Sequence, residues 1–571
     1  MRLFVAGMLV AGAATMWAQG DPPSRVARLN FLEGSVSYQA AGHDDWAAAA
    51  INYPLTVGDH LWADENSRAE LHIGSTAIRM DAHTALAFLN LDDRITQVRL
   101  SDGSINVSIR YLDENESYEV DTPNGAVTLL RPGRYRIDAD PDRQLTTVTV
   151  RGGEAEVTAG GQAFPVHPRQ SAYVTGEEQP NTEVANAGPS DDFDRWWETR
   201  DDREDRRPPP RYVSRDMIGY EDLDEYGTWR DYPGYGPCWV PRVQAGWAPY
   251  HYGHWVWVEP WGWTWVDDAP WGFAPFHYGR WAFYGGGWVW VPGAMVARPV
   301  YAPALVAWVG GPHFGVAIGI GAGVGWFPLG PREPYVPAYR VSNTYINRVN
   351  VTHVTNVTNI TNVTNVTYVN QRVPGAVTAV SRADFAASRP VSRSAIAVPP
   401  SAVASASVTT REMPVTRQEA FAARPVSNVA VARPSRQILS TPVVTKTPPP
   451  AATASLARPA NAYRAPAVYE RPNQPATARP QTQSEPAYRP PTTYSTPSRP
   501  QTQPQAQPQP TYRPQTQAQP TYRPPAGQAR PESVTPPHQH GPDRPPAAER
   551  RQNTEERRPE RARPEKERKE H

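Results

Sequence analysis

The chain has 571 residues, its 57 Lys and Arg balance 57 Asp and Glu, and its formal net charge at pH 7 is zero. Cys238 is its single cysteine, which excludes an intramolecular disulfide and a zinc site built on paired cysteines. The sequence has 19 Trp and 64 Pro, so we expect aromatic-rich and proline-rich regions to be organised separately.

Charge is distributed unevenly along the chain. Residues 21–205 contain 33 acidic and 16 basic side chains, whereas residues 371–541 contain 6 acidic and 19 basic ones. Opposite charge in two parts of one chain favours contact of the basic part with a polyanion or with the chain's own acidic domain. A solvated basic tail is the alternative interpretation.

The N-terminus has the pattern of a secretory signal peptide over residues 1–20. Arg2 provides a positive start, residues 3–16 are apolar, and Ala18-Gln19-Gly20 is a small-x-small cleavage site. The apolar stretch is shorter than the roughly 20 residues of a spanning helix. We therefore expect export to the periplasm, the cell envelope or the medium, with an uncleaved N-terminal anchor as the alternative.

Residues 21–178 have the pattern of a β domain. Alternating or β-branched runs are separated by turn dipeptides such as Asp102-Gly103, Asn124-Gly125 and Gly152-Gly153, which predicts a sandwich or rolled barrel. The predicted strands are 34–38, 69–73, 77–80, 95–100, 105–109, 126–130, 134–138, 145–150 and 155–157.

Several motifs of this region resemble the FecR domain, in the order that the family has them. They include Glu33-Gly-Ser-Val36, Val120-Asp-Thr-Pro-Asn-Gly-Ala-Val127, Pro132-Gly-Arg-Tyr-Arg-Ile-Asp138 and Val150-Arg-Gly-Gly-Glu-Ala-Glu-Val157. The resemblance covers about residues 26–176. Proteins similar to FecR sense a signal in the periplasm and pass it to a cytoplasmic sigma factor. The resemblance thus implies a β fold, a compartment and, as one alternative, an envelope signal sensor.

Residues 179–219 are predicted to be a polar linker. Within it, Asp191-Asp-Phe-Asp-Arg-Trp-Trp-Glu198 can start a short helix, which the charged run 200–207 and the prolines 208–210 would end.

Residues 220–340 contain an aromatic repeat. Tyr226-Gly-Thr-Trp229, Tyr252-Gly-His-Trp255 and Tyr278-Gly-Arg-Trp281 recur every 26 residues, and each is followed by a Gly and a Trp-containing run around Trp239, Trp265 or Trp290. Trp-x-Trp spacing places alternate rings on one face of a strand. We expect each unit to be a β-hairpin and the units to stack so that their rings are buried. This region also resembles a Trp/Tyr/Gly-rich domain of unknown function that often follows a FecR domain and implies no activity.

Glycine alternates with larger residues between Gly315 and Trp326, which predicts a strand whose glycine face is closely approached by another backbone. A membrane-spanning helix over residues 304–327 is the alternative, because this stretch is long enough and uncharged.

The C-terminal third has low complexity. Residues 341–372 carry a Val-Thr-Asn repeat, interpreted as a spacer, and residues 373–571 are rich in Pro, Arg, Gln, Ala, Ser and Thr. So little apolar surface favours a disordered tail.

Recognised catalytic motifs are not found, so no catalytic residue, cofactor or metal is predicted and we expect a protein that is not an enzyme. Asp267-Asp268 could be a carboxylate pair, but a turn between repeats fits better. His251, His254 and His277 lie near one another in the repeats, where a structural role is favoured over metal binding. Cys238 is interpreted as a small packed residue.

The aromatic rings are the candidate binding site. Exposed rows of Trp and Tyr could stack on sugar rings of a cell-wall or extracellular polysaccharide, and a core role is the favoured alternative. The predicted platform consists of Trp229, Trp239, Trp255, Trp265, Trp281, Trp290, Tyr252 and Tyr278. The sequence thus predicts an all-β envelope protein that binds a polysaccharide, peptidoglycan or another envelope protein. No nucleic-acid partner is expected, and membrane association stays open.

Overall fold

The structure is a computed structural model that describes residues 20–310, 314–315, 318–319, 323–350, 367–409, 413–423 and 431–459. The predicted signal peptide, most of the Val-Thr-Asn repeat and the tail from residue 460 lie outside these residues. The described part is predominantly β-structure, as the sequence predicts.

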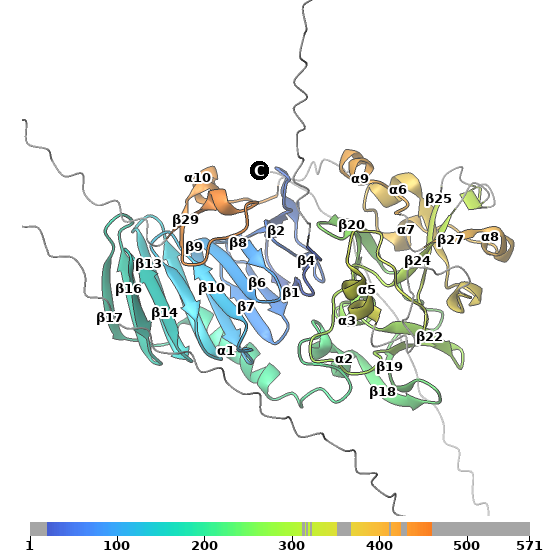
Figure 1. Cartoon of the computed structure of the whole chain (residues 1–571), viewed down its shortest axis with the longest axis horizontal. Coiled ribbons are helices and arrows are strands. Elements are labelled where there is room, and N and C mark those ends of the chain that lie inside the picture. The colour runs from blue at the N-terminus through green and yellow to red at the C-terminus, as the bar shows by residue number, and fades with distance from the viewer. Residues whose placement is uncertain are drawn as a thin grey trace, which may run out of the picture. The chain divides into compact units, whose positions relative to one another are not determined.

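The N-terminal β domain is a sandwich of two sheets (Figure 1). The first sheet has the order β4 (Pro54–Leu55), β1 (Ala27–Glu33), β6 (Arg68–Ile73), β7 (Thr76–Met80), β9 (Ile95–Ile109), β12 (Gly133–Asp140), β13 (Leu145–Gly152), β16 (Gln170–Thr175), β17 (Asn181–Asn186). The second sheet has the order β3 (Ala47–Ala48), β2 (Val36–Gln39), β5 (His60–Ala63), β8 (Thr84–Leu91), β9, β10 (Ser117–Asp121), β11 (Ala126–Leu129), β14 (Ala155–Ala159), β15 (Gln162–Val166).

Strand β9 belongs to both sheets and corrects one prediction. The sequence predicts two strands separated by a turn at Asp102-Gly103, but the structure has one continuous strand of 15 residues. Its first half pairs with β8 and β10, and its second half pairs with β7 and β12. Gly103 has a φ of +91°, and a Cβ there would overlap the backbone at His83 and Thr84. This glycine therefore makes a corner instead of a hairpin turn.

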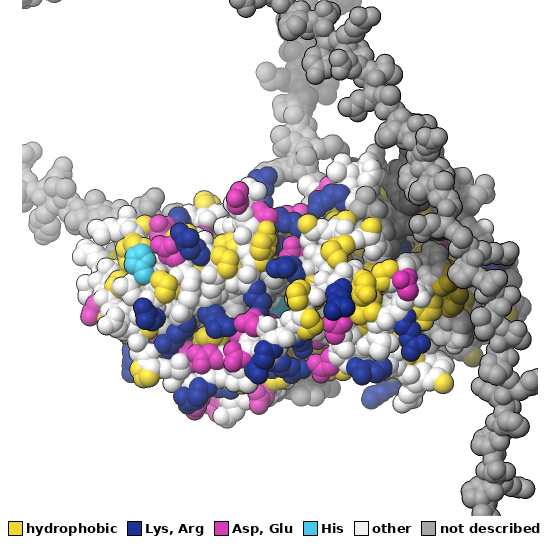
Figure 2. Space-filling model, turned by 90° about the horizontal axis from the view of Figure 1, so that it is seen from below, with side chains coloured by type: hydrophobic (Ala, Val, Ile, Leu, Met, Phe, Trp, Pro, Cys, Tyr) yellow, Lys and Arg dark blue, Asp and Glu magenta, His cyan; other side chains and the backbone are white. Residues whose placement is uncertain are grey.

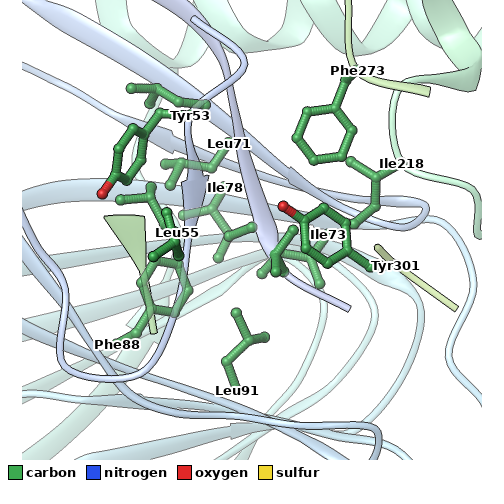
Figure 3. Packing of buried hydrophobic residues seen from close by; sticks show 14 of the residues in the cluster. Tyr53, Leu55, Leu71, Ile73, Ile78, Phe88, Leu91, Ile218, Phe273 and Tyr301 are labelled. Carbon is green, nitrogen blue, oxygen red and sulfur yellow. The ribbon is translucent and has the colours of Figure 1, made fainter. Parts of the chain in front are cut away.

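The sandwich core is filled by alternating aliphatic residues. On β9, for example, Val98, Leu100, Ile105 and Val107 are buried between the sheets. This core continues into the hairpin domain, because Ile218, Phe273 and Tyr301 belong to the same buried cluster (Figure 3).

The predicted polar linker is largely structured. Residues 181–186 form β17 at the edge of the first sheet, and helix α1 (Asp192–Asp205) covers the outer face of that sheet. Asp191 caps α1 by accepting a hydrogen bond from the Asp194 N–H, so the helix begins and ends close to where the sequence predicts. Its charged side chains are anchored on the sheet, which the sequence analysis did not anticipate.

The hairpin domain follows after η1 (Tyr220–Asp222) and α2 (Leu223–Tyr226). Its described residues form four hairpins: β18 (Gly227–Tyr232) with β19 (Gly236–Pro241), β20 (Gly253–Val258) with β21 (Gly262–Asp267), β22 (Arg280–Tyr284) with β23 (Gly287–Val291), and β24 (Val306–Gly310) with β25 (Gly323–Pro328). Helix α3 (Ala274–His277) precedes the third hairpin, and α5 (Asn343–Asn350) follows the fourth. The first and third hairpins join edge to edge into one four-stranded sheet.

Each hairpin has a Trp opposite another Trp on its partner strand. The pairs are Trp229–Trp239, Trp255–Trp265, Trp281–Trp290 and Trp308–Trp326. Because Trp239 is also opposite Trp290, four indoles form one row across the four-stranded sheet. The sequence analysis found three of the four hairpins, and Trp308, 27 residues after Trp281, marks the fourth.

The glycine of each Tyr-Gly-x-Trp motif has a packing role. A Cβ at Gly227, Gly253 or Gly279 would overlap the indole of Trp239, Trp265 or Trp290, which is the second Trp of the same hairpin. The motif therefore keeps the side chain of one strand small so that the ring of the next strand can lie against its backbone.

The prediction that the disordered tail begins at residue 373 is wrong, because residues 373–459 contribute ordered elements to both domains. Strands β26 (Thr378–Ser381) and β27 (Ser407–Thr409) extend the sheet of the fourth hairpin on either side. The others are α6 (Arg382–Ala386), α7 (Val391–Ser394), α8 (Pro400–Ser405), α9 (Arg417–Ala423), α10 (Arg436–Ser440), β28 (Val443–Thr445), η4 (Ala454–Leu456) and β29 (Ala457–Pro459), and η3 (Asn370–Arg372) comes just before this stretch. Phe385 of α6 packs on Trp255, Trp263, Trp308 and Trp326.

Residues 304–327 contain β24 and the start of β25. Among the described residues, the structure has no helix long and apolar enough to cross a membrane. The described end of the predicted glycine-alternating strand is β25, Gly323–Pro328, and residues 316, 317 and 320–322 of that prediction lie outside the described residues.

Candidate binding surface and the charged junction

The structure buries six of the eight rings of the predicted platform. Trp239, Trp255, Trp265, Trp281, Trp290 and Tyr278 are almost fully inaccessible to solvent. A buried indole has no free face for a sugar ring, so these rings have the core role that the sequence analysis favoured. Trp229 is half-buried against Tyr212 and Trp290, and Tyr252 is exposed.

Exposed rings instead gather at the tips of the first and third hairpins. Tyr235, Phe283 and Tyr284 are 37%, 41% and 44% exposed, and half-buried Tyr232 meets Tyr284 edge-on with ring centroids 5.0 Å apart. Exposed aromatic side chains that gather at one end of a sheet are candidates for an interaction surface. We call Tyr232, Tyr235, Phe283 and Tyr284 the aromatic edge.

A second candidate site is a cluster of charged side chains that we call the charged junction. It is formed by Arg28, Glu70, His72, Arg79, Asp201, Glu204, Glu221 and Asp222. At its centre, Glu70 of β6 accepts hydrogen bonds from Arg79 Nε and Arg200 Nε, each at 2.6 Å. Arg79 also reaches Asp201 of α1 at 2.8 Å. Burial alone would raise the pKa of Glu70, but Arg79 and then His72 hold it well below its usual value. Glu70 is therefore a buried carboxylate ion.

His72 links three carboxylates from different elements. Its Nδ1 lies 2.7 Å from Glu221 of η1, and its Nε2 lies 3.1 Å from Glu70 and 3.5 Å from Glu204 of α1. Burial alone would lower the pKa of His72, but Glu221 and Glu204 outweigh it and raise that pKa well above its usual value. The ring is thus an imidazolium ion at neutral pH.

Arg28 of β1 extends this network into the hairpin domain. Its guanidinium contacts Asp222 at 2.6 Å and Glu221 at 3.2 Å, and it donates to the carbonyl of Pro270 at 2.5 Å. Asn52 donates to the carbonyls of Asp267 and Ala269 at 2.8 and 2.7 Å. Polar contacts and a shared core therefore fix the β domain to the first two hairpins.

Glu70, His72 and Glu204 place three potential metal ligands within 4.8 Å of one another. Two guanidinium groups already engage Glu70, and they would repel a divalent cation at this position. We therefore interpret the junction as an ion-pair network. Arginine and acidic side chains also alternate over the exposed surface on the α1 side of the molecule (Figure 2).

The residues that the sequence suggested for catalysis or metal binding make separate structural contacts. Asp267 is buried and accepts hydrogen bonds from Trp265 Nε1 and the Ala269 N–H, whereas Asp268 is exposed. The three histidines serve separate contacts: His277 with the Ala302 carbonyl, His251 with Thr378, and His254 with Asp268 at 4.0 Å. Cys238 is buried as expected, and burial raises the pKa of its thiol to about 11.

Sequence reasoning missed the junction. Glu70 and His72 lie two residues apart in a predicted strand, so their common face could have been noted. Their partners, however, include Arg200 in the segment interpreted as a linker and Glu221 just after it, 130 and 149 residues further along the chain.

The fold defines an all-β protein in which a sandwich and a set of aromatic hairpins share one core. Residues 220–333 match a protein family described as a family of unknown function, DUF6600. No curated protein matches the chain.

Two crystal structures entitled "a putative anti-sigma factor from Parabacteroides distasonis", at 2.50 and 1.65 Å resolution, are similar at 18% and 17% identity, each with a TM-score of 0.21. Each match covers 22% of this chain and 59% of the other, so the chain spans less than two thirds of their length.

Proposed function

We propose that this chain is an exported, non-enzymatic interaction protein of the bacterial envelope that binds a cell-wall or extracellular polysaccharide through the aromatic edge. The exposure of Tyr235, Phe283 and Tyr284 at two adjoining hairpin tips carries this proposal. Tyrosine offers a ring face to a sugar and a hydroxyl that donates a hydrogen bond, while the buried Trp rows hold the tips rigidly.

The resemblance of residues 26–176 to the FecR domain supports the compartment, since proteins similar to FecR act in the periplasm. In this proposal the β domain is the support to which the charged junction fixes the hairpins. A ligand bound at the tips is then held by a rigid body rather than by a flexible arm.

Co-sedimentation with insoluble peptidoglycan and with purified exopolysaccharide tests the proposal. We expect Tyr284→Ala and Tyr235→Ala each to weaken binding about tenfold, which corresponds to ~1.4 kcal/mol for a lost stacking contact. Tyr111→Ala is the matched control, because Tyr111 is 45% exposed on the β domain. Unchanged binding in both tip variants, or no binding by the wild-type chain, would reject the aromatic edge as a polysaccharide site.

Signalling to a sigma factor is a second candidate, supported by the ordered FecR-like motifs between Glu33 and Val157. It requires part of the chain to remain in the cytoplasm. A reporter fused to the N-terminus should then stay active in the cytoplasm and attached to the protein. Loss of the reporter by cleavage during export would eliminate this candidate.

A further inference from the structure

Residues 431–459, which we call the strap, lie on the outer face of the second sheet. Figure 1 shows α10 and β29 in orange beside the blue strands β8, β9 and β10. Ser37 donates to the Ala432 carbonyl at 2.5 Å, and Thr453 donates to the Leu89 carbonyl at 2.7 Å. The strap therefore crosses the sheet from β2 to β10 and returns to β8, although it follows the sheet by more than 250 residues.

The sheet contacts mainly the backbone of the strap. Arg99 Nη2 lies 2.7 to 2.9 Å from the carbonyl oxygens of Ile438, Leu439 and Thr441. Glu119 accepts hydrogen bonds from the N–H groups of Lys446 and Thr447, at 2.8 and 3.0 Å. Backbone contacts of this kind recognise an extended peptide and depend little on its sequence.

Some side chains of the strap are recognised as well: Lys446 Nζ pairs with Glu156 at 2.6 Å, and Thr447 is held by two residues of the sheet. The Thr447 hydroxyl donates to Glu119 at 2.5 Å, and Gln97 donates to the Thr447 carbonyl at 2.8 Å. A hydroxyl residue at this position completes the hydrogen bonds of the carboxylate, and valine, of the same shape, could not.

This face is unusually polar for a surface that is covered. Gln97, Arg99, Glu119 and Asp121 are each no more than 2% exposed. Arg99 contacts carbonyl groups of the strap instead of a carboxylate, and burial lowers its pKa to about 10. Covering the Arg99 guanidinium without an opposite charge is costly, and an apolar residue at this position would make a permanent contact more stable.

Several buried polar atoms of the second sheet remain without hydrogen-bond partners. They are Gln97 Oε1, Arg99 Nε, Asp121 Oδ1, Thr128 Oγ1 and Thr158 Oγ1. All five belong to β9, β10, β11 and β14 of the second sheet. The outer face of the first sheet differs, since α1 meets Arg79 with the carboxylate of Asp201. The strap therefore leaves some hydrogen-bonding groups of the second sheet without partners.

From these contacts we propose that the outer face of the second sheet is a peptide-binding groove, which the strap occupies as an internal ligand. An extended peptide of a partner protein, with Ser or Thr at the position of Thr447, binds there by displacing the strap. This surface is separate from the aromatic edge and does not depend on its function.

The full chain with a specific protease site inserted at residues 424–430 tests the proposal. After cleavage, we expect residues 431–571 to co-elute with the rest of the protein in gel filtration. A large excess of a synthetic peptide of residues 431–459 should then release that fragment within hours and take its place, as measured with a fluorescent label. Immediate loss of the fragment without competitor, or retention despite excess peptide, would overturn the proposal.

Peptide variants avoid any effect on folding of the protein. A Thr447→Val peptide should compete at least tenfold less well than the wild-type peptide. A Thr441→Val peptide is the matched control, because the Thr441 hydroxyl bonds Gln437 of the strap itself. Equal competition by the two variant peptides would show that Glu119 does not recognise the Thr447 hydroxyl. Arg99→Ala in the full chain should release the cleaved fragment faster, provided its circular dichroism is unchanged.

Discussion

The two domains build their cores from different side chains. The sandwich is filled by aliphatic residues such as Val98, Leu100 and Ile105, whereas the hairpin domain is filled by paired indoles such as Trp255 and Trp265. Two broad sheets enclose a continuous core even with small side chains. An isolated two-stranded hairpin is marginal in water, and a ring that buries about 150–250 Å² supplies more apolar contact per position. Narrow sheets therefore require large residues.

Removing one central ring is the strongest test of this difference. Trp255 contacts Trp265, Trp308, Trp326 and Phe385, with centroids 4.8 to 5.6 Å apart. Trp255→Ala should lower the free energy of unfolding by about 3–5 kcal/mol. Val107→Ala in the sandwich should cost only about 1–3 kcal/mol, because fewer methyl groups are lost. Urea unfolding followed by circular dichroism measures the two stability losses. Equal losses would show that the hairpin domain does not depend more strongly on a single large side chain than the sandwich does.

The charged junction joins the two domains, and His72→Gln should weaken it. Replacing the imidazolium leaves two buried carboxylates and the partly buried Glu204 with one fewer cation, which should cost about 3 kcal/mol at pH 6. Because the folded-state pKa of His72 is raised, its stabilisation is complete below about pH 6.5 and is lost as pH rises through that folded-state pKa. The loss should thus be smaller at pH 10 than at pH 6.

The free energies of unfolding of the wild-type chain and of His72→Gln, measured at pH 6 and at pH 10, test this prediction. His83→Gln is the control, since that side chain is 58% exposed. A loss in His72→Gln that does not change with pH would mean that the ring's shape, and not its charge, supports the junction.

The Gly–Trp contact is predicted to have a smaller effect. Gly227 has an extended backbone with φ −157°, so alanine there is not strained, but its Cβ would overlap the buried Trp239 ring. Gly227→Ala should cost about 1–3 kcal/mol. Gly287→Ala, at a position with open space around the added Cβ, should change stability by less than about 0.5 kcal/mol. Thermal unfolding of the two variants separates ring contact from the general effect of alanine.

The aromatic edge should contribute least to stability. Tyr284 is 44% exposed, and its replacement by alanine should change the free energy of unfolding by less than about 0.5 kcal/mol. A loss as large as that of Trp255→Ala would assign the tip rings to the core and remove them as a binding surface. Differential scanning calorimetry is sufficient for this comparison.

Local patterns predicted the class of the fold and three of the four hairpins. The fourth was missed because Val306 stands where the earlier motifs have glycine, and because Trp308 and Trp326 lie much further apart than Trp281 and Trp290. Asp102-Gly103 was interpreted as a turn since a glycine at positive φ serves a corner and a turn equally well.

The sites were harder to predict than the fold. Alternation places rings on one face of a strand but does not say whether that face is covered, so the platform included six buried rings. Glu70 with Arg200, and Arg99 with Ile438, are polar pairs separated by 130 and 339 residues. Phe193 and Trp197 have the spacing of one helix face, but that spacing does not predict which sheet residues the charged side chains of α1 contact, and the strap has no periodic apolar pattern.

The position of the strap has a consequence for how the molecule is made. The strands of the second sheet end at residue 166, whereas the strap that lies on the outer face of that sheet comes from residues 431–459. At a ribosomal rate of about 5–20 residues per second, the segment in between takes roughly 10–50 s to synthesise. Until residues 431–459 have been made and have reached the folded sandwich, the strap cannot cover the polar face of the second sheet, and a peptide of another protein has no internal competitor there.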